Sequence, residues 1–193
     1  IETETKEEKD SLNSLFSDVL ADMEEEASYT PESFAVFKAA FEEAEQVLAL
    51  GDAASLEDIK EAKLNLQKAW DELELKEGIV VDKTTLNELL EKAKVLLNGK
   101  YTEESLTKLQ QQITSATETA EDEKATSGKV NRAITELQNA IDGLVPIYTV
   151  TFHWNYALAA VITQDVVKDS AVTAPAQAPK RTGYTFTGKW YKD

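Results

Sequence analysis

Two hydrophobic periodicities divide the chain into a helical part and a β part. Apolar residues recur at three- and four-residue steps through residues 1–145, which is the period of an amphipathic helix. From Tyr148 to Trp154 they alternate with polar residues, which is the period of a half-buried strand. Pro146 lies where the two patterns meet, so we expect the change of structure at this residue.

Residues 1–78 carry three helical stripes with start signals between them. Thr30 and Pro31 suit the N-cap and first position of the second helix, which Gly51 ends. Ser55 suits the N-cap of the third helix, with Asp58 placed to complete a capping box. Three amphipathic helices with short connections predict an up-down-up bundle. The expected core positions are Leu12, Leu15, Phe16, Val19, Met23, Phe34, Phe37, Phe41, Ala44, Leu48, Ile59, Ala62, Leu66, Ala69, Trp70 and Leu73.

The same plan repeats in residues 79–145, and a repeat of this length predicts a second copy of the bundle. The first stripe returns 74 positions later, the start of the second helix 72 later and the end of the third helix 71 later. The offset shrinks only between helices, so the length differences fall in loops. Trp70 and Ile141 hold equivalent positions, and we expect both to be buried.

These repeated residues resemble the bacterial FIVAR module, named for being found in various architectures. The matching features are Tyr-Thr-x-Glu-Ser at the start of the second helix and the closing Leu-Gln-x-Ala-(Trp/Ile)-Asp-x-Leu, over roughly residues 6–145. The resemblance implies a context in large secreted or wall-attached proteins of Gram-positive and gut bacteria, including carbohydrate-active enzymes and matrix-binding adhesins. It implies no catalytic signature.

The last segment, residues 146–193, predicts three strands. The first is the alternating run at Tyr148, the second spans residues 161–167, and the third spans residues 183–188 after breaks at Pro175 and Pro179. Its two ends, Tyr-Thr-Val-Thr-Phe and Arg-Thr-Gly-Tyr-Thr-Phe-Thr-Gly-Lys-Trp-Tyr-Lys-Asp, resemble the Listeria–Bacteroides repeat of internalin-type surface proteins. That resemblance implies a small β-grasp-like module. The middle departs from the family, which normally continues to one more aromatic strand, so we expect a truncated module here.

Composition removes most kinds of catalytic chemistry. The 193 residues carry 36 acidic and 20 basic side chains, a formal charge of −16, and residues 1–78 alone hold 22 of the acids. Such a surface repels a polyphosphate, so we expect no nucleic-acid partner. Without Cys and with His153 as the single His, thiolate zinc sites and His-rich metal clusters are excluded. We therefore expect no enzyme, no cofactor and no metal site.

The remaining candidate residues are weighed against a structural role. His153 lies on the polar side of its strand, where a surface position is favoured over a catalytic one. The acidic runs at residues 24–26 and 42–45 lack the Gly turn of a calcium loop. Trp70 could stack on a sugar, but its replacement by Ile141 in the second copy favours a core role. The candidates for a protein or glycan contact surface are Trp154, Tyr156, Trp190 and Tyr191.

The sequence thus predicts a multidomain, mainly α chain with two tandem three-helix bundles and a small C-terminal β module. The expected domains are residues 1–78, 79–145 and 146–193. The chain begins with Ile1 and shows neither a signal peptide nor a membrane span, so we expect a monomeric segment of a longer protein. We expect it to be extracellular or attached to a bacterial cell wall.

Of three functions considered, the first is the one expected, and the other two are its alternatives. The first is a non-catalytic stalk or adhesion segment that contacts a host or matrix protein, or a glycan. The second is a set of accessory carbohydrate-binding modules of an extracellular glycoside hydrolase, and the third is an enzyme with a deep acidic pocket. The short apolar connection from Leu144 to Ile147 further predicts that the β module docks on the second bundle through buried aromatic residues.

Overall fold

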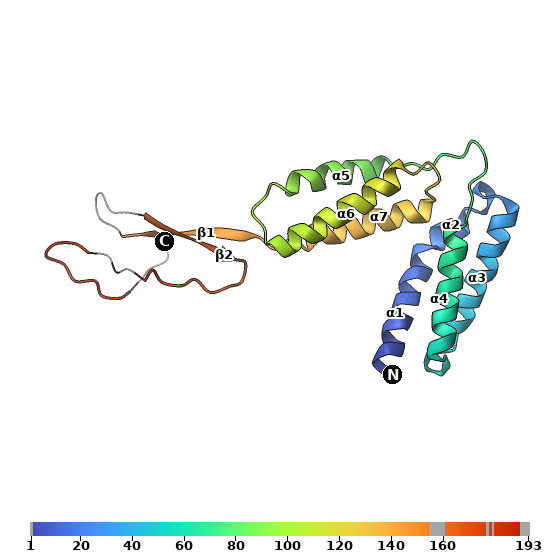
Figure 1. The fold of residues 1–193 in the computed structure, drawn as a ribbon, viewed down its shortest axis with the longest axis horizontal. Coiled ribbons are helices and arrows are strands. Elements are labelled where there is room, and N and C mark those ends of the chain that lie inside the picture. The colour runs from blue at the N-terminus through green and yellow to red at the C-terminus, as the bar shows by residue number, and fades with distance from the viewer. Residues whose placement is uncertain (1, 155–160, 177, 179, 190–193) are drawn as a thin grey trace.

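The computed structural model describes residues 2–154, 161–176, 178 and 180–189. Its elements follow in the order α1 (Glu2–Asp18), α2 (Leu20–Glu24), α3 (Pro31–Ala49), α4 (Leu56–Asp71), α5 (Thr84–Leu96), α6 (Glu103–Glu121), α7 (Ser127–Asp142), β1 (Ile147–His153) and β2 (Val161–Val167). Helices α1–α4 form a first bundle and α5–α7 a second, and the two meet at a wide angle (Figure 1). The predicted class, mainly α with a small C-terminal β region, is confirmed.

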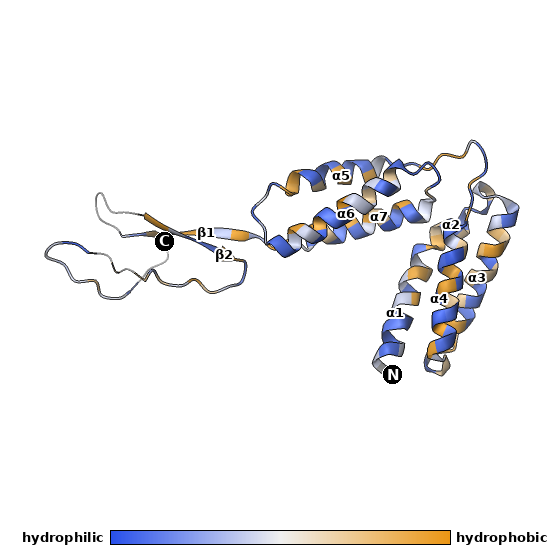
Figure 2. Cartoon of the chain, viewed as in Figure 1, coloured by the Kyte–Doolittle hydropathy of each residue, from blue (hydrophilic) through white to orange (hydrophobic). Residues whose placement is uncertain are grey.

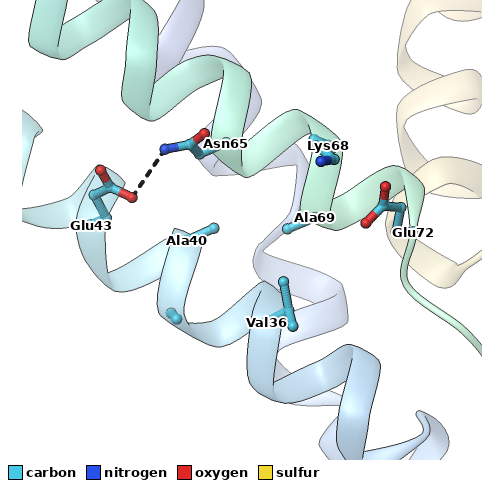
Figure 3. Close-up of a pocket in the computed structure, with 8 residues that line it drawn as sticks. Val36, Ala40, Glu43, Asn65, Lys68, Ala69 and Glu72 are labelled. Atoms are coloured by element: carbon cyan, nitrogen blue, oxygen red, sulfur yellow. Dashed lines mark hydrogen bonds between the residues drawn. The ribbon is translucent and has the colours of Figure 1, made fainter.

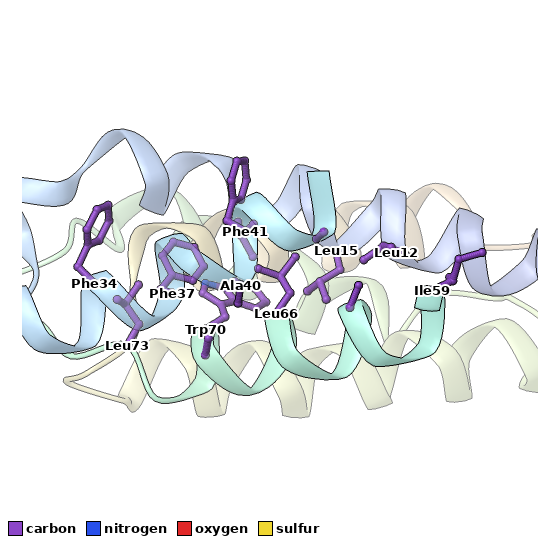
Figure 4. Close-up of a cluster of buried hydrophobic side chains, with 14 of the residues drawn as sticks. Leu12, Leu15, Phe34, Phe37, Ala40, Phe41, Ile59, Leu66, Trp70 and Leu73 are labelled. Carbon is purple, nitrogen blue, oxygen red and sulfur yellow. The ribbon is translucent and has the colours of Figure 1, made fainter. Parts of the chain in front are cut away.

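Each bundle has a core of its own. In the first bundle the predicted stripes converge, and Trp70 is buried beside Phe37 and Leu66 (Figure 4). The Phe16 and Phe41 rings are stacked, with 4.2 Å between their centroids. Figure 2 shows hydrophobic and hydrophilic residues sharing each helix, as expected where one face of a helix is buried. The core of the second bundle contains Leu86, Leu90, Ala93, Leu109, Ile113, Ala116, Ala125, Val130, Ala133 and Leu137.

Three local predictions are wrong. The first helix is interrupted at Val19, which separates α1 from α2. Thr30 makes no side-chain cap to α3, because its hydroxyl pairs with the Ser33 hydroxyl at 2.8 Å. Phe16, Met23 and Leu48 in the first bundle and Ile141 in the second are only partly buried, although each packs against its core. The capping box of Ser55 and Asp58 at the start of α4 is confirmed.

A short backbone ladder closes each bundle in the same way. In the first, the Thr30 amide donates to the Glu74 carbonyl at 2.9 Å. In the second, the Thr102 amide donates to the Val145 carbonyl at 2.9 Å and the Ile147 amide to the Lys100 carbonyl at 2.8 Å. Strand β1 therefore begins as a continuation of the ladder that closes the second bundle.

The strands β1 and β2 pair antiparallel, from Ile147 opposite Val167 to His153 opposite Val161, and project from the end of the second bundle (Figure 1). Besides the ladder, the Lys100 ammonium contacts Thr149 and Asp165 of the hairpin. Of the aromatic residues predicted to dock the β module, Tyr148 does not take this role, because its side chain is 56% exposed. Backbone hydrogen bonds and Lys100 connect the hairpin to the second bundle.

The predicted third strand at residues 183–188 is not formed. Gly183 and Gly188 have φ of +80° and +79°, so the backbone turns at both places and cannot run extended through them. Arg181 and Tyr184 form an isolated bridge around the first of these turns, and the Arg181 guanidinium lies 4.1 Å from the Tyr184 ring centroid. His153 lies exposed at the end of β1, as expected for a surface residue.

Candidate functional site at the joint between the bundles

The structure describes one of the four aromatic residues predicted to contact a partner. Trp154 follows β1 and is half-buried. Tyr156, Trp190 and Tyr191 lie outside the described residues, so the contact surface that they would form stays a prediction.

A groove of about 320 Å³ runs between α3 and α4 (Figure 3). Its floor contains small apolar side chains such as Ala40 and Ala69, and Glu43 accepts a hydrogen bond from Asn65 at 3.4 Å. The carboxylates of Glu43 and Glu72 lie at opposite ends of the view, so they do not form an acid pair. This groove therefore does not supply the paired acids that glycoside hydrolysis needs.

A fully buried carboxylate, with hydrogen bonds to both of its oxygens, lies where the two bundles meet. Asp22 is the third residue of α2 and has no exposed surface. The Tyr29 hydroxyl donates to Oδ1 at 2.5 Å, and the Trp70 indole Nε1–H donates to Oδ2 at 2.5 Å. Burying a carboxylate is costly unless its oxygens are hydrogen-bonded, and these two donors from the first bundle meet half of that requirement.

The second bundle supplies the other half. The Thr126 hydroxyl donates to Oδ2 at 2.8 Å, and the Gly128 amide donates to Oδ1 at 2.9 Å. Thr126 is the N-cap of α7, and Gly128 is the second residue of that helix, so the carboxylate lies at the positive end of the helix dipole. Each oxygen of Asp22 thus accepts one hydrogen bond from each bundle, and all four are charge-assisted.

Gly128 is required by the close approach of the carboxylate. A Cβ atom at this position would lie 2.3 Å from Oδ2 of Asp22 and 2.9 Å from the backbone oxygen of Asp18. Both distances are shorter than van der Waals contact, so any side chain here would displace the first bundle. We call the contact between α1, α2 and α4 on one side and the start of α7 on the other the joint.

Charged side chains surround this buried centre. Arg132 lies 3.6 Å from an Asp18 carboxylate oxygen, and Lys129 lies 4.0 Å from one of Asp71. The Lys129 ammonium and the Arg132 guanidinium each lie 5.9 Å from the centroid of the Trp70 ring, within cation–π range. The cations of α7 therefore cover the indole that the first bundle presents.

The pKa values of Tyr29 and Asp18 are shifted by their surroundings in the joint. Burial, together with the hydrogen bond to Asp22, raises the pKa of the Tyr29 hydroxyl well above its ordinary value. Burial also raises the pKa of Asp18, and Arg132 offsets that effect only in part. The ion pair between Arg132 and Asp18 is therefore a weaker source of stability than the four neutral donors that hydrogen-bond to Asp22.

The sequence analysis missed this joint, although two signals were present. Asp22 lies three residues after Val19, on the side of the helix that faces the core, where a charged residue is unexpected. Gly128 lies inside a helical stripe, where it weakens a helix unless close packing requires it. Neither signal says which partner the residue meets, because no period connects positions so far apart in sequence.

The described residues offer neither a cluster of metal ligands nor a membrane-spanning helix. Among the described residues, no group of three or more His, Asp or Glu side chains is placed to hold a metal ion. In the same part of the chain, no helix has the length and apolar character needed to cross a membrane.

Comparison with known proteins places the two bundles in a family. The FIVAR domain matches residues 9–74 and again residues 82–145, whereas no solved structure matches the chain. FIVAR domains occur in extracellular and cell-surface bacterial proteins, often together with glycoside hydrolases, and are accessory rather than catalytic. Since the two matches cover most of the sequence and correspond to the two helical bundles, the chain belongs to the FIVAR domain family.

Proposed function

We propose that this chain is a non-catalytic spacer in a secreted or cell-wall-attached bacterial protein, and that it holds neighbouring parts at a fixed separation. The joint is the observation that supports this function. A flexible connection between bundles would bury no carboxylate, whereas here Asp22 accepts hydrogen bonds from both. Separating the bundles would leave that charge without two of its four donors, which strongly opposes bending.

We also propose the domain limits 1–78, 79–145 and 146–193. Each helical segment has its own hydrophobic core, and the ladder that closes the second bundle marks the start of the β module. For residues 146–193 we propose a Listeria–Bacteroides-type module with an adhesive role toward a host or matrix protein. The antiparallel pair of β1 and β2 is compatible with such a module.

Distance measurements between spin labels test the spacer function. The chain has no Cys, so Glu42→Cys in α3 and Gln111→Cys in α6 give one label on the exposed surface of each bundle. We expect a single narrow distance distribution, comparable in width to that of a control pair within the first bundle, Glu42→Cys and Glu61→Cys. A broad distribution for the first pair alone would contradict a rigid spacer.

A second candidate function is support of an extracellular glycoside hydrolase by carbohydrate binding, favoured by the frequent occurrence of FIVAR domains beside such enzymes. The residues proposed for this role are Trp154, Tyr156, Trp190 and Tyr191. Binding on a glycan array that disappears in Trp190→Ala would support it. A chain that binds no glycan on the array would leave the spacer function as the only one of the two.

A further inference from the structure

The two copies of the repeat differ at the residues that make the joint. Helix α4 is the first bundle's equivalent of α7, with an offset of 71 positions. At the start of α7 stand the residues that meet Asp22, Trp70 and Asp18. Gly128, Lys129 and Arg132 correspond to Glu57, Asp58 and Glu61 in α4. The small residue and both cations are thus replaced by acids.

The helix starts also differ in how their backbone amides are satisfied. In α4 the Ser55 hydroxyl accepts from the Asp58 amide at 3.1 Å, and the Ser55 amide donates to the Asp58 carboxylate at 3.3 Å. This capping box serves α4 from within. In α7 the equivalent of Asp58 is Lys129, which cannot accept a hydrogen bond, and the anion near the amides comes from Asp22 of the other bundle.

The residues on the acceptor side of the joint also differ between the two copies. Asp18, Asp22 and Trp70 of the first bundle correspond to Lys92, Leu96 and Ile141 of the second. The second bundle therefore has neither the carboxylate nor the indole with which to make the same contact again.

We infer that the joint is an order-specific interaction surface. Its acceptor side is the α1–α2 corner with Trp70, and its receiving side is a bundle whose third helix begins with a hydroxyl cap, a glycine and two cations. The acceptor corner would meet Glu57, Asp58 and Glu61 if it docked on a bundle of the first kind, and like charges oppose that contact. This inference goes beyond the spacer function, because the order of the two bundles would be encoded whatever the chain supports.

Exchanging the three residues between the copies tests the inference in the full-length chain. With the spin labels at positions 42 and 111, we expect G128E/K129D/R132E to replace the narrow distance distribution with a broad one. The reciprocal set, E57G/D58K/E61R, changes the start of α4, whereas α4 takes part in the joint through Trp70 near its other end. This set should leave the distribution narrow. Helical content measured by circular dichroism shows whether both variants remain folded.

A milder change addresses the possibility that the triple variant unfolds. Gly128→Ala adds one methyl group, which favours helix formation in α7 but cannot be accommodated beside Asp22. We expect the joint to open while α7 keeps its helical content. Asn131→Ala, an exposed control in the same helix, also favours helix formation and should leave the joint closed.

The chain that carries both sets of substitutions gives the decisive result. Its acceptor corner is free and its receiving residues lie in α4 of the same bundle, so the two cannot meet within one molecule and should join chains head to tail. Sedimentation velocity should show mass that rises with concentration for this chain but not for either single set. A joint that stays closed in both G128E/K129D/R132E and Gly128→Ala, or a doubly exchanged chain that sediments as the wild type does, would overturn the inference.

Discussion

Replacing Asp22 with Asn keeps the shape of the side chain but exchanges one acceptor oxygen for a donating amide. The Tyr29 and Thr126 hydroxyls can rotate to accept, but the Trp70 indole N–H and the Gly128 amide N–H can only donate. Each of these two obligate donors faces a different oxygen of Asp22. Whichever way the Asn side chain is turned, its NH₂ group therefore faces one N–H that cannot accept.

The expected loss can be estimated from the hydrogen bonds that change. One buried donor without an acceptor costs about 1–3 kcal/mol, and each of the three remaining bonds loses charge assistance worth about 1 kcal/mol. Allowing for non-additivity, Asp22→Asn should lower the free energy of unfolding by about 3–5 kcal/mol. Because each oxygen serves both bundles, no orientation of Asn confines the damage to one of them.

Urea unfolding followed by circular dichroism measures this loss, together with the indole N–H resonance of Trp70 in a ¹⁵N-labelled chain. We expect the midpoint of the least stable transition to fall by at least about 1 M urea, and the Trp70 resonance to move. Glu24→Gln removes the same charge from an exposed neighbour in α2 and should change stability by no more than about 0.5 kcal/mol. An Asp22→Asn chain that unfolds like the Glu24→Gln control would refute the reasoning.

Three further comparisons test the joint, a helix cap and the burial of the two equivalent core residues. Folding raises the pKa of Tyr29 above its unfolded value of about 10, so the stability that its neutral hydroxyl contributes is complete below about pH 10 and is lost as the pH rises further. Urea midpoints measured from pH 8 to 11 should show this alkaline loss in the wild type and not in Tyr29→Phe. Ser55→Ala should lower the free energy of unfolding by about 1 kcal/mol, because it removes the cap of α4. Thr126→Ala should lower it by about 2–3 kcal/mol, because the Thr126 hydroxyl also donates across the joint. Equal losses in urea unfolding would argue against that donation. Trp70→Ala should lower the free energy of unfolding by on the order of 3–5 kcal/mol and Ile141→Ala by clearly less, since of these two side chains only that of Trp70 is fully buried. Thermal unfolding that ranks the two variants in the opposite order would contradict the assigned burial.

The bundles could be predicted because burial leaves a periodic trace in the sequence. Leu12, Phe37 and Leu66 recur at helical spacing with their neighbours, and each is buried as that spacing predicts. Ser55 could be predicted as a cap because its partner lies three residues away. Interactions of short range in sequence, or repeated along a helix, are therefore the ones that were recognised.

The joint could not be predicted because it depends on how two finished bundles meet. Asp22 and Gly128 lie 106 positions apart, and neither belongs to a repeated pattern. The unequal burial of Trp70 and Ile141 has the same origin, since Lys129 and Arg132 of the second bundle cover only the first of these side chains. Nothing in the local sequence marks the interruption at Val19 that separates α1 from α2.

The wide angle between the bundles gives the segment an inside and an outside (Figure 1). A straight rod presents equivalent surroundings on all sides, whereas a bent one has a concave side, sheltered between its two arms, and a convex side open to solvent. Structures attached beyond α1 and beyond the hairpin would be turned toward different directions rather than merely moved apart. Held by a buried charge, this bend makes orientation, and not length alone, a property that the pair of bundles can transmit.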